Sequence, residues 1–122
     1  MNTTDIRMRR VEGAAIVYPG AYLNQLRGES IERCCLELLA DGVRHIVINF
    51  SETELINSIG ISILLGVIEA VNDARGTLVL AGLSASNREL FEMLGLASHV
   101  RIAGSEEAAL ADLYDEIQSA AV

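Results

Sequence analysis

Short apolar runs rich in β-branched residues alternate along the chain with longer amphipathic segments. The runs HIVINF and TLVLA are continuously apolar, which is typical of strands buried on both faces. Near the N-terminus, two shorter runs lie on either side of Glu12 and Gly13, which predicts a hairpin. The predicted strands are residues 5–11, 14–18, 45–50, 77–81 and 99–102.

The longer segments have apolar residues at helical spacing. In the first of them these residues recur three and four positions apart, and Asp41-Gly42 ends the pattern. In the last, Glu106 and Glu107 occupy the first turn, where acidic side chains favour a helix. The predicted helices are residues 30–40, residues 58 onward to about Arg75, residues 87–94 and residues 105–119.

The order of these elements is β-β-α-β-α-β-α-β-α. Strands that alternate with helices after an initial hairpin predict an α/β fold with a mixed, largely parallel sheet of five strands and four helices. The 122 residues suffice for one domain, which we expect to span residues 1–122 with its core at about residues 5–119.

The segment LINSIGISILLG, residues 55–66, starts a helix in an unusual way. Asn57 is a good N-cap, which makes Ser58 the first helical residue. The free N–H groups and positive dipole of a helix start can hold an anion, so a phosphate on Ser58 would be tolerated and would add close to two negative charges. A serine at this position is also often only a cap, and both interpretations stay open here.

The helix that follows lacks a polar face at its start. Over residues 58–68 only two serines are polar, so one apolar stripe must pack on the sheet. The remaining apolar surface, either at Ile59 and Ile63 or on the neighbouring turn, would be exposed. Exposed apolar surface of this kind marks protein contacts. Gly60 and Gly66 each weaken a helix by about 1 kcal/mol relative to Ala, which suggests that another group approaches the helix backbone closely. The alternative is complete burial of this helix in a small core.

Composition and charge narrow the classes of function. Hydrophobic residues make up 51% of the chain but aromatic residues only 4%, so we expect an aliphatic core. The formal charge of −8 argues against nucleic acid, because phosphate contacts need clustered Lys and Arg. No apolar stretch approaches the roughly 20 residues of a membrane span, and MNTTDIRMRR has no signal-peptide core. We expect a cytoplasmic protein, monomeric or a weak homodimer.

Catalytic and metal-binding patterns are not apparent. Cys34 and Cys35 are adjacent within a predicted helix, and His45 and His99 stand alone, so neither metal-ligand spacing nor a nucleophile–base set is present. Small polar residues at 82–86 follow a strand, where ligands sit in open α/β sheets, but a loop-to-helix junction explains them equally well. We expect no enzyme activity, no cofactor and no metal.

A family resemblance rests on several segments in order. The strand at residues 45–50 followed by INSIGISILLG resembles the STAS domain of bacterial anti-sigma-factor antagonists, where Asp-Ser-(Ser/Thr)-Gly precedes an apolar helix with a later glycine. The segments TLVLAGLS, LFEMLGL and VRIAGSEEAALADL are also similar to that family. The resemblance covers most of the chain, from about Ile6 onward, and implies a STAS-like fold.

The resemblance implies a mechanism of partner switching. Ser58 matches the serine that an anti-sigma factor with kinase activity phosphorylates, and Gly60 matches the motif glycine. Asn57 replaces the motif Asp and Ile59 its second hydroxyl residue, so a charge is lost and apolar surface gained. The unphosphorylated protein would bind the anti-sigma factor and release the sigma factor, phosphate would weaken binding, and a serine phosphatase would restore it. The expected contact residues are Asn57, Ser58, Ile59, Gly60, Ser62, Ile63 and Gly66.

A second hypothesis uses the same apolar helix without a switch. The chain would then be a non-phosphorylated STAS subunit of a transporter or of a stress-signalling assembly, and would act as a protein-binding module. A small ligand in the crevice of the sheet is a third possibility, which only the fold supports.

Overall fold

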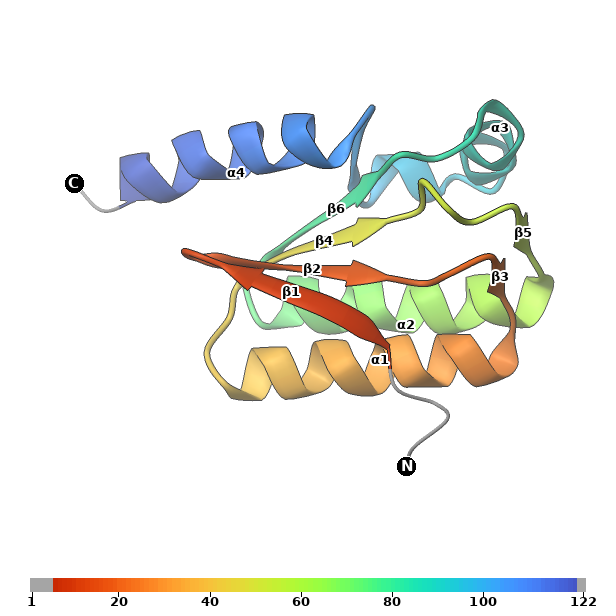
Figure 1. The fold of residues 1–122 in the computed structure, drawn as a ribbon, viewed down its shortest axis with the longest axis horizontal. Coiled ribbons are helices and arrows are strands. Elements are labelled where there is room, and N and C mark those ends of the chain that lie inside the picture. The colour runs from red at the N-terminus through yellow and green to blue at the C-terminus, as the bar shows by residue number, and fades with distance from the viewer. Residues whose placement is uncertain (1–5, 121–122) are drawn as a thin grey trace.

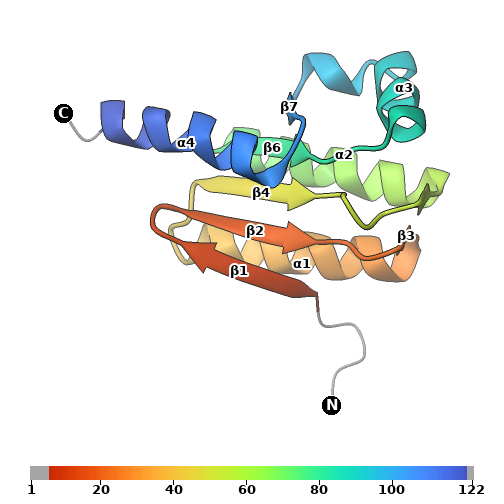
Figure 2. The same cartoon turned by 45° about the horizontal axis from the view of Figure 1, so that its top comes forward.

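The computed structural model describes residues 6–120, which form a central sheet with helices on both faces (Figure 1). The strands of this sheet are β1 (Arg7–Val11), β2 (Ala14–Tyr18), β4 (His45–Asn49), β6 (Thr77–Ala81) and β7 (Arg101–Ala103). The helices are α1 (Gln25–Ala40), α2 (Ser58–Asp73), α3 (Ala85–Met93) and α4 (Glu106–Ala120), with a short 3₁₀-helix at Leu96–Ser98. Helices α1 and α2 cover one face of the sheet and α4 covers the other (Figures 1 and 2).

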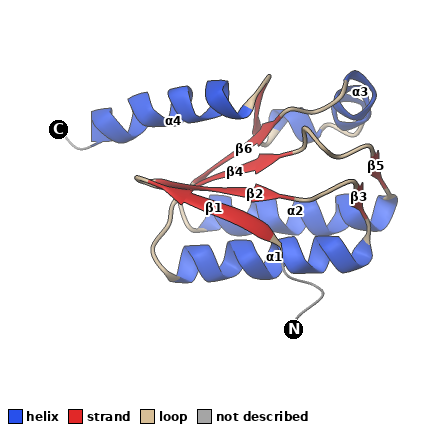
Figure 3. Cartoon of the chain, in the orientation of Figure 1, coloured by secondary structure: helices blue, strands red, loops and turns tan. Residues whose placement is uncertain are grey.

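The sheet confirms the predicted α/β architecture. Its strand order is β1-β2-β4-β6-β7, with β1 antiparallel to β2 and every other neighbouring pair parallel. The five strands and four α-helices follow the predicted order, with two short strands added. These are β3 (Tyr22–Leu23) and β5 (Leu55–Ile56), which pair in parallel beside the start of α2 (Figure 3).

The continuously apolar strands are buried on both faces, as predicted. Side chains alternate across a strand, so Ile46 and Ile48 of β4 pack toward α1 and α2, while Val47 between them packs toward α4. Both layers are mostly aliphatic. The larger layer also contains Phe50 and Phe91, whose rings meet edge to face with centroids 6.1 Å apart.

The predicted start of the first helix, residue 30, is wrong. Helix α1 begins at Gln25, because the Asn24 side chain accepts a hydrogen bond from the Arg27 amide at 3.0 Å and caps the helix there. Ser30 lies inside the helix and donates to the Leu26 carbonyl. Gly28, which precedes the predicted start, is helical and packs against Ile63 of α2. A Cβ at this position would lie 3.0 Å from Ile63 Cδ1.

Other boundaries differ by a few residues. Helix α3 starts at Ala85 rather than at residue 87, because Ser84 Oγ accepts from the Asn87 amide. The last strand is Arg101–Ala103 rather than residues 99–102, since His99 is the C-cap of the preceding 3₁₀-helix. The third predicted strand ends one residue earlier, at Asn49. Residue 5 of the first predicted strand lies outside the described residues.

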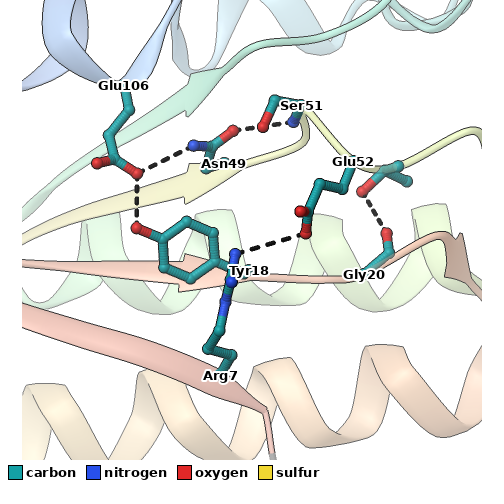
Figure 4. A network of polar contacts seen from close by, with 8 residues as sticks. Arg7, Tyr18, Gly20, Asn49, Ser51, Glu52 and Glu106 are labelled. Atoms are coloured by element: carbon teal, nitrogen blue, oxygen red, sulfur yellow. Dashed lines mark hydrogen bonds and ion pairs between the residues drawn. The ribbon is translucent and has the colours of Figure 1, made fainter.

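The partly buried carboxylate of Glu106 connects the hairpin to α4 (Figure 4). Glu106 accepts hydrogen bonds from Tyr18 Oη at 2.6 Å and from Asn49 Nδ2 at 3.0 Å, and it pairs with Arg9. Partial burial raises the pKa of the Glu106 carboxyl, but the hydrogen bonds from Tyr18, Asn49 and Arg9 and the charge of Arg9 outweigh it. The pKa of Glu106 is therefore lowered.

The glycines of α2 give a first prediction. A Cβ at Gly60 would lie 2.5 Å from the Leu23 carbonyl oxygen, whereas a Cβ at Gly66 would meet only Glu32 Oε2, at 3.5 Å. We expect Gly60→Ala to destabilise the fold by about 1–3 kcal/mol, because backbone must move. The matched Gly66→Ala should stabilise it by up to about 1 kcal/mol through helix propensity. Urea denaturation of both variants checks this, and equal effects would contradict the contact.

The Glu106 network gives a second prediction. Because the folded pKa is depressed, its stabilisation is fully present above the unfolded pKa of about 4.3 and is lost as pH falls through the folded pKa. We expect Glu106→Gln to cost about 1–3 kcal/mol at neutral pH. Urea denaturation across acid pH should show this difference shrink. The neighbouring Glu107→Gln is the control, and a pH-independent difference for Glu106→Gln would argue against the charge.

Candidate functional site

The start of α2 is built by its cap residue. Asn57 Oδ1 accepts a hydrogen bond from the Gly60 amide at 2.8 Å, and the Asn57 carbonyl accepts from the Ile61 amide at 3.0 Å. Ser58 follows as the first helical residue, and its side chain is exposed. The first amides of a helix have no partners within it, and the dipole is positive there. The site can therefore accommodate a phosphate on Ser58 without disruption of the helix.

The turn that carries Ser58 is held by backbone hydrogen bonds to the segment before α1. The amides of Glu54 and Leu55 donate to the Ala21 carbonyl, at 2.9 and 3.2 Å, and the Asn57 amide donates to the Leu23 carbonyl at 3.1 Å. These bonds join the strands β3 and β5. The close approach needs Gly60, whose missing side chain leaves room for the same Leu23 carbonyl.

Side-chain contacts add to this support. Thr53 is buried and donates its hydroxyl to the Gly20 carbonyl at 2.7 Å, and Asn57 Nδ2 donates to Tyr22 Oη at 3.3 Å. The Ser58 side chain therefore projects to solvent, while hydrogen bonds hold the backbone around it in place.

Large apolar side chains are exposed close to Asn57 and Ile59, the two neighbours of Ser58 in the chain. Tyr22 and Leu55 face each other across the β3–β5 pair, and Leu26 and Ile59 line an open hollow of about 480 Å³ together with Asn57. Between 42% and 57% of each apolar residue is exposed. Exposed apolar side chains grouped beside polar groups are typical of a protein contact. We call Tyr22, Leu26, Leu55, Asn57, Ser58 and Ile59 the Ser58 surface.

The predicted contact residues fall into two groups. Asn57, Ser58, Ile59 and Ser62 lie at the solvent side of α2, with Ser62 exposed one turn after Ser58. The others face inward: Gly60 contacts Leu23, Ile63 packs on Gly28, and Gly66 faces Glu32 of α1. The close backbone approach at Gly60 is therefore to this chain itself and not to a partner.

Complete burial of α2, the alternative interpretation, is wrong. Ile59 and Leu65 are both exposed on the outer side of the helix, while Leu64, Val67 and Ile68 pack on the sheet. Exposed apolar side chains therefore exist on α2, but not as the predicted stripe: Ile59 is exposed, whereas Ile63 packs on Gly28 of α1.

Three residues of the Ser58 surface were missed by the sequence analysis. Tyr22 and Leu26 lie in the segment that gave no regular pattern, and Leu55 precedes the predicted helix. One signal could have found Leu26: once the helix starts at Gln25, this leucine lies away from the buried positions Ile31, Cys35 and Leu38.

The cysteines and histidines do not form a site in residues 6–120, where no group of three His, Cys, Asp or Glu residues is placed to hold a metal ion. Burial raises the pKa of the Cys35 thiol to about 12 and also raises the pKa of Cys34. Both thiols are therefore protonated at neutral pH. No helix in the described part of the chain is long and apolar enough to cross a membrane.

Comparison with known proteins places the chain in a family and finds sequence relatives. A model of the STAS domain matches residues 5–109. The protein of Bordetella bronchiseptica (strain RB50) named "Putative anti-sigma factor antagonist BtrV" is 29% identical over 106 residues, which cover 87% of this chain and 91% of that protein.

Solved structures of two other proteins have a similar fold. The anti-sigma factor antagonist SpoIIAA in its unphosphorylated form matches with a TM-score of 0.71 and 17% identity, over 93% of this chain and 97% of that one. The phosphorylated form of SpoIIAA from Bacillus gives a TM-score of 0.72 at 19% identity, over 88% and 98% of the chains. A sulfate transporter family protein from Wolinella succinogenes gives 0.79 at 15% identity, over 87% and 88%. At these identities the likeness concerns the fold alone.

Proposed function

Because the chain belongs to the STAS domain family, we propose that it is an anti-sigma factor antagonist switched off by phosphorylation at Ser58. Its similarity to BtrV, which is named as such an antagonist, supports this class. The observation that carries the proposal is the Ser58 surface, where an exposed hydroxyl on a capped helix start lies among exposed apolar side chains.

The unphosphorylated surface is the form that binds. Tyr22, Leu55 and Ile59 would be buried against an anti-sigma factor with serine kinase activity, which then releases its sigma factor. Burial of apolar surface contributes about 25 cal/mol per Å², so these side chains can anchor the complex. The rigid backbone beneath them limits the entropy lost on binding.

Phosphate would reverse this binding. A phosphoserine carries nearly two negative charges, which must be desolvated if an apolar contact forms over it. Glu29 also lines the hollow beside Ile59, and no basic residue lines it, so the added charge would lack a local cation within this hollow. A serine phosphatase would restore the binding form. The chain acts as a kinase substrate rather than as a catalyst, in the cytoplasm.

A second candidate is a STAS subunit that is not phosphorylated. The likeness in fold to a sulfate transporter family protein supports it, as do Asn57 and Ile59 in place of the motif's Asp and hydroxyl residue. Such a subunit, in a transporter or a stress-signalling assembly, would use the same apolar surface. Neighbouring genes separate the two: a kinase-like ATPase and a sigma factor favour the switch, and transporter genes favour the subunit.

Phosphorylation gives a third prediction. With its cognate anti-sigma kinase and ATP, the protein should incorporate phosphate at Ser58, and Ser58→Ala should abolish the incorporation. Ser62→Ala, one turn further along the exposed side of α2, is the matched control and should be phosphorylated normally. Mass-spectrometric mapping of the modified peptide is the measurement. Phosphate on another residue, or none with the cognate kinase, would refute the switch and leave the subunit hypothesis.

Binding gives a fourth prediction. Ser58→Asp should weaken the complex with the anti-sigma factor by about tenfold or more, since a charge then lies at a desolvated contact. Ile59→Ala should weaken it by a similar factor through loss of an apolar anchor. Ser86→Asp, at an exposed position of α3, is the control for the added charge. Titration calorimetry gives the affinities, and unchanged binding of Ser58→Asp would show that the contact lies elsewhere.

A further inference from the structure

A second apolar surface lies between α4 and the β1–β2 hairpin. It is lined by Val11 and Ala14 of the hairpin and by Leu110, Tyr114 and Ile117 of α4, and its volume is about 430 Å³. We call it the α4–hairpin groove. Tyr114, which forms part of its wall, is 59% exposed.

This groove is separate from the Ser58 surface. Helix α4 covers the face of the sheet opposite to α1 and α2, and it passes over the turn of the hairpin, at the end of the molecule away from β3 and β5 (Figures 1 and 2). The helix meets the turn near Ile117, because a Cβ at Gly13 would lie 2.9 Å from Ile117 Cδ1. One molecule could therefore have both surfaces occupied at once.

Two carboxylates line the groove, Glu12 and Glu107, and neither has a charged partner among residues 6–120. Helix α4 contains five acidic residues and no basic one. Two of them are satisfied within the fold: Glu106 pairs with Arg9, and Glu116 pairs with Arg101 at 2.7 Å. Among residues 6–120, no ion pair or side-chain hydrogen bond is formed by the exposed carboxylates Glu12, Glu107, Asp112 and Asp115.

The charge decides between possible occupants. A second copy of this chain would bring a net charge of −8 and the same acidic helix, so self-association through the groove is disfavoured. An apolar groove lined by two carboxylates, Glu12 and Glu107, instead complements apolar side chains flanked by Lys or Arg.

The spacing of the carboxylates indicates the size of the occupant. Glu107 lies in the first turn of α4, and Glu12 precedes the glycine that contacts Ile117. Ten residues of helix separate Glu107 from Ile117, which corresponds to about 15 Å. Both carboxylates line the groove, at its two ends. One cationic head group cannot reach both, whereas a polypeptide can present two basic residues at that distance.

We propose that the α4–hairpin groove binds a partner protein through a helical segment whose apolar side chains lie between two basic residues about ten positions apart. The apolar residues contact Leu110 and Tyr114, and the basic residues pair with Glu12 and Glu107. This surface does not depend on the proposed role of Ser58.

A designed peptide tests this chemistry. The probe is an alanine-based helical peptide with two arginines about ten residues apart and leucines between them on the same face. The control peptide has glutamates in place of the arginines. In NMR titrations of the ¹⁵N-labelled full chain, the arginine peptide should shift the amide resonances of α4 and the hairpin. Added salt should weaken the binding of this peptide. The glutamate peptide should not bind.

Variants of the chain locate the binding. Tyr114→Ala should lower the affinity for the arginine peptide by about tenfold, as expected for the loss of a buried aromatic anchor. Met93→Ala, which removes an exposed apolar side chain from α3, should have no effect. Glu107→Lys should weaken binding by about fivefold or more, while Asp73→Lys, at the end of α2, changes the net charge equally and should not.

Any of the following results would overturn the proposal: amide shifts that map outside α4 and the hairpin, equal binding of the glutamate peptide, or equal effects of Glu107→Lys and Asp73→Lys. Absence of any binding by the arginine peptide would overturn it as well. Because neither Ser58 nor an anti-sigma factor takes part in this experiment, its outcome is separate from that of the phosphorylation test.

Discussion

The close contact between the start of α2 and the Leu23 carbonyl is the constraint on which the Ser58 surface depends. Only a glycine fits at position 60, since a Cβ there would lie 2.5 Å from that oxygen. The same carbonyl accepts the amide of Asn57, and the neighbouring β3–β5 pair joins the segments before α1 and α2. Asn57 can then cap α2 and leave Ser58 directed to solvent. A flexible turn would present the same residues but would have to lose conformational entropy on each binding event.

The two faces of the sheet are covered unequally, and the exposed apolar surface follows from this. Two helices cover one face, and their outer sides meet solvent at Leu26 and Ile59. The other face has α4 alone, which leaves the groove beside the hairpin. Internal ion pairs engage several of the chain's few basic residues: Arg9 pairs with Glu106 and Arg101 with Glu116. Helix α4 contains no basic residue, so the charge that these pairs leave on it is negative, although the hairpin beside it contains three arginines.

Local patterns predicted the elements with the strongest periodicity and lost accuracy at their ends. The strands at residues 45–50 and 77–81 are found almost as predicted, because burial on both faces requires uninterrupted apolar sequence. The start of α1 was misplaced because Asn24 and Ser30 are both good caps by residue type. Gly28 lies within the helix, at a position where Ile63 of α2 occupies the space that a side chain would need. That contact joins residues far apart in the sequence, so no local pattern could indicate it.

For the candidate site, the sequence alone determined the position of Ser58 at a helix start and the excess of apolar residues behind it, because capping and amphipathicity are local properties. Tertiary structure decided which of those residues face solvent. It turned Gly60, Ile63 and Gly66 toward this chain's own backbone and α1. It also brought Tyr22 and Leu26, from a segment without a clear pattern, beside Asn57, the residue before Ser58. The α4–hairpin groove likewise exists only in the folded chain, because its two walls come from opposite ends of the sequence and meet when the sheet forms.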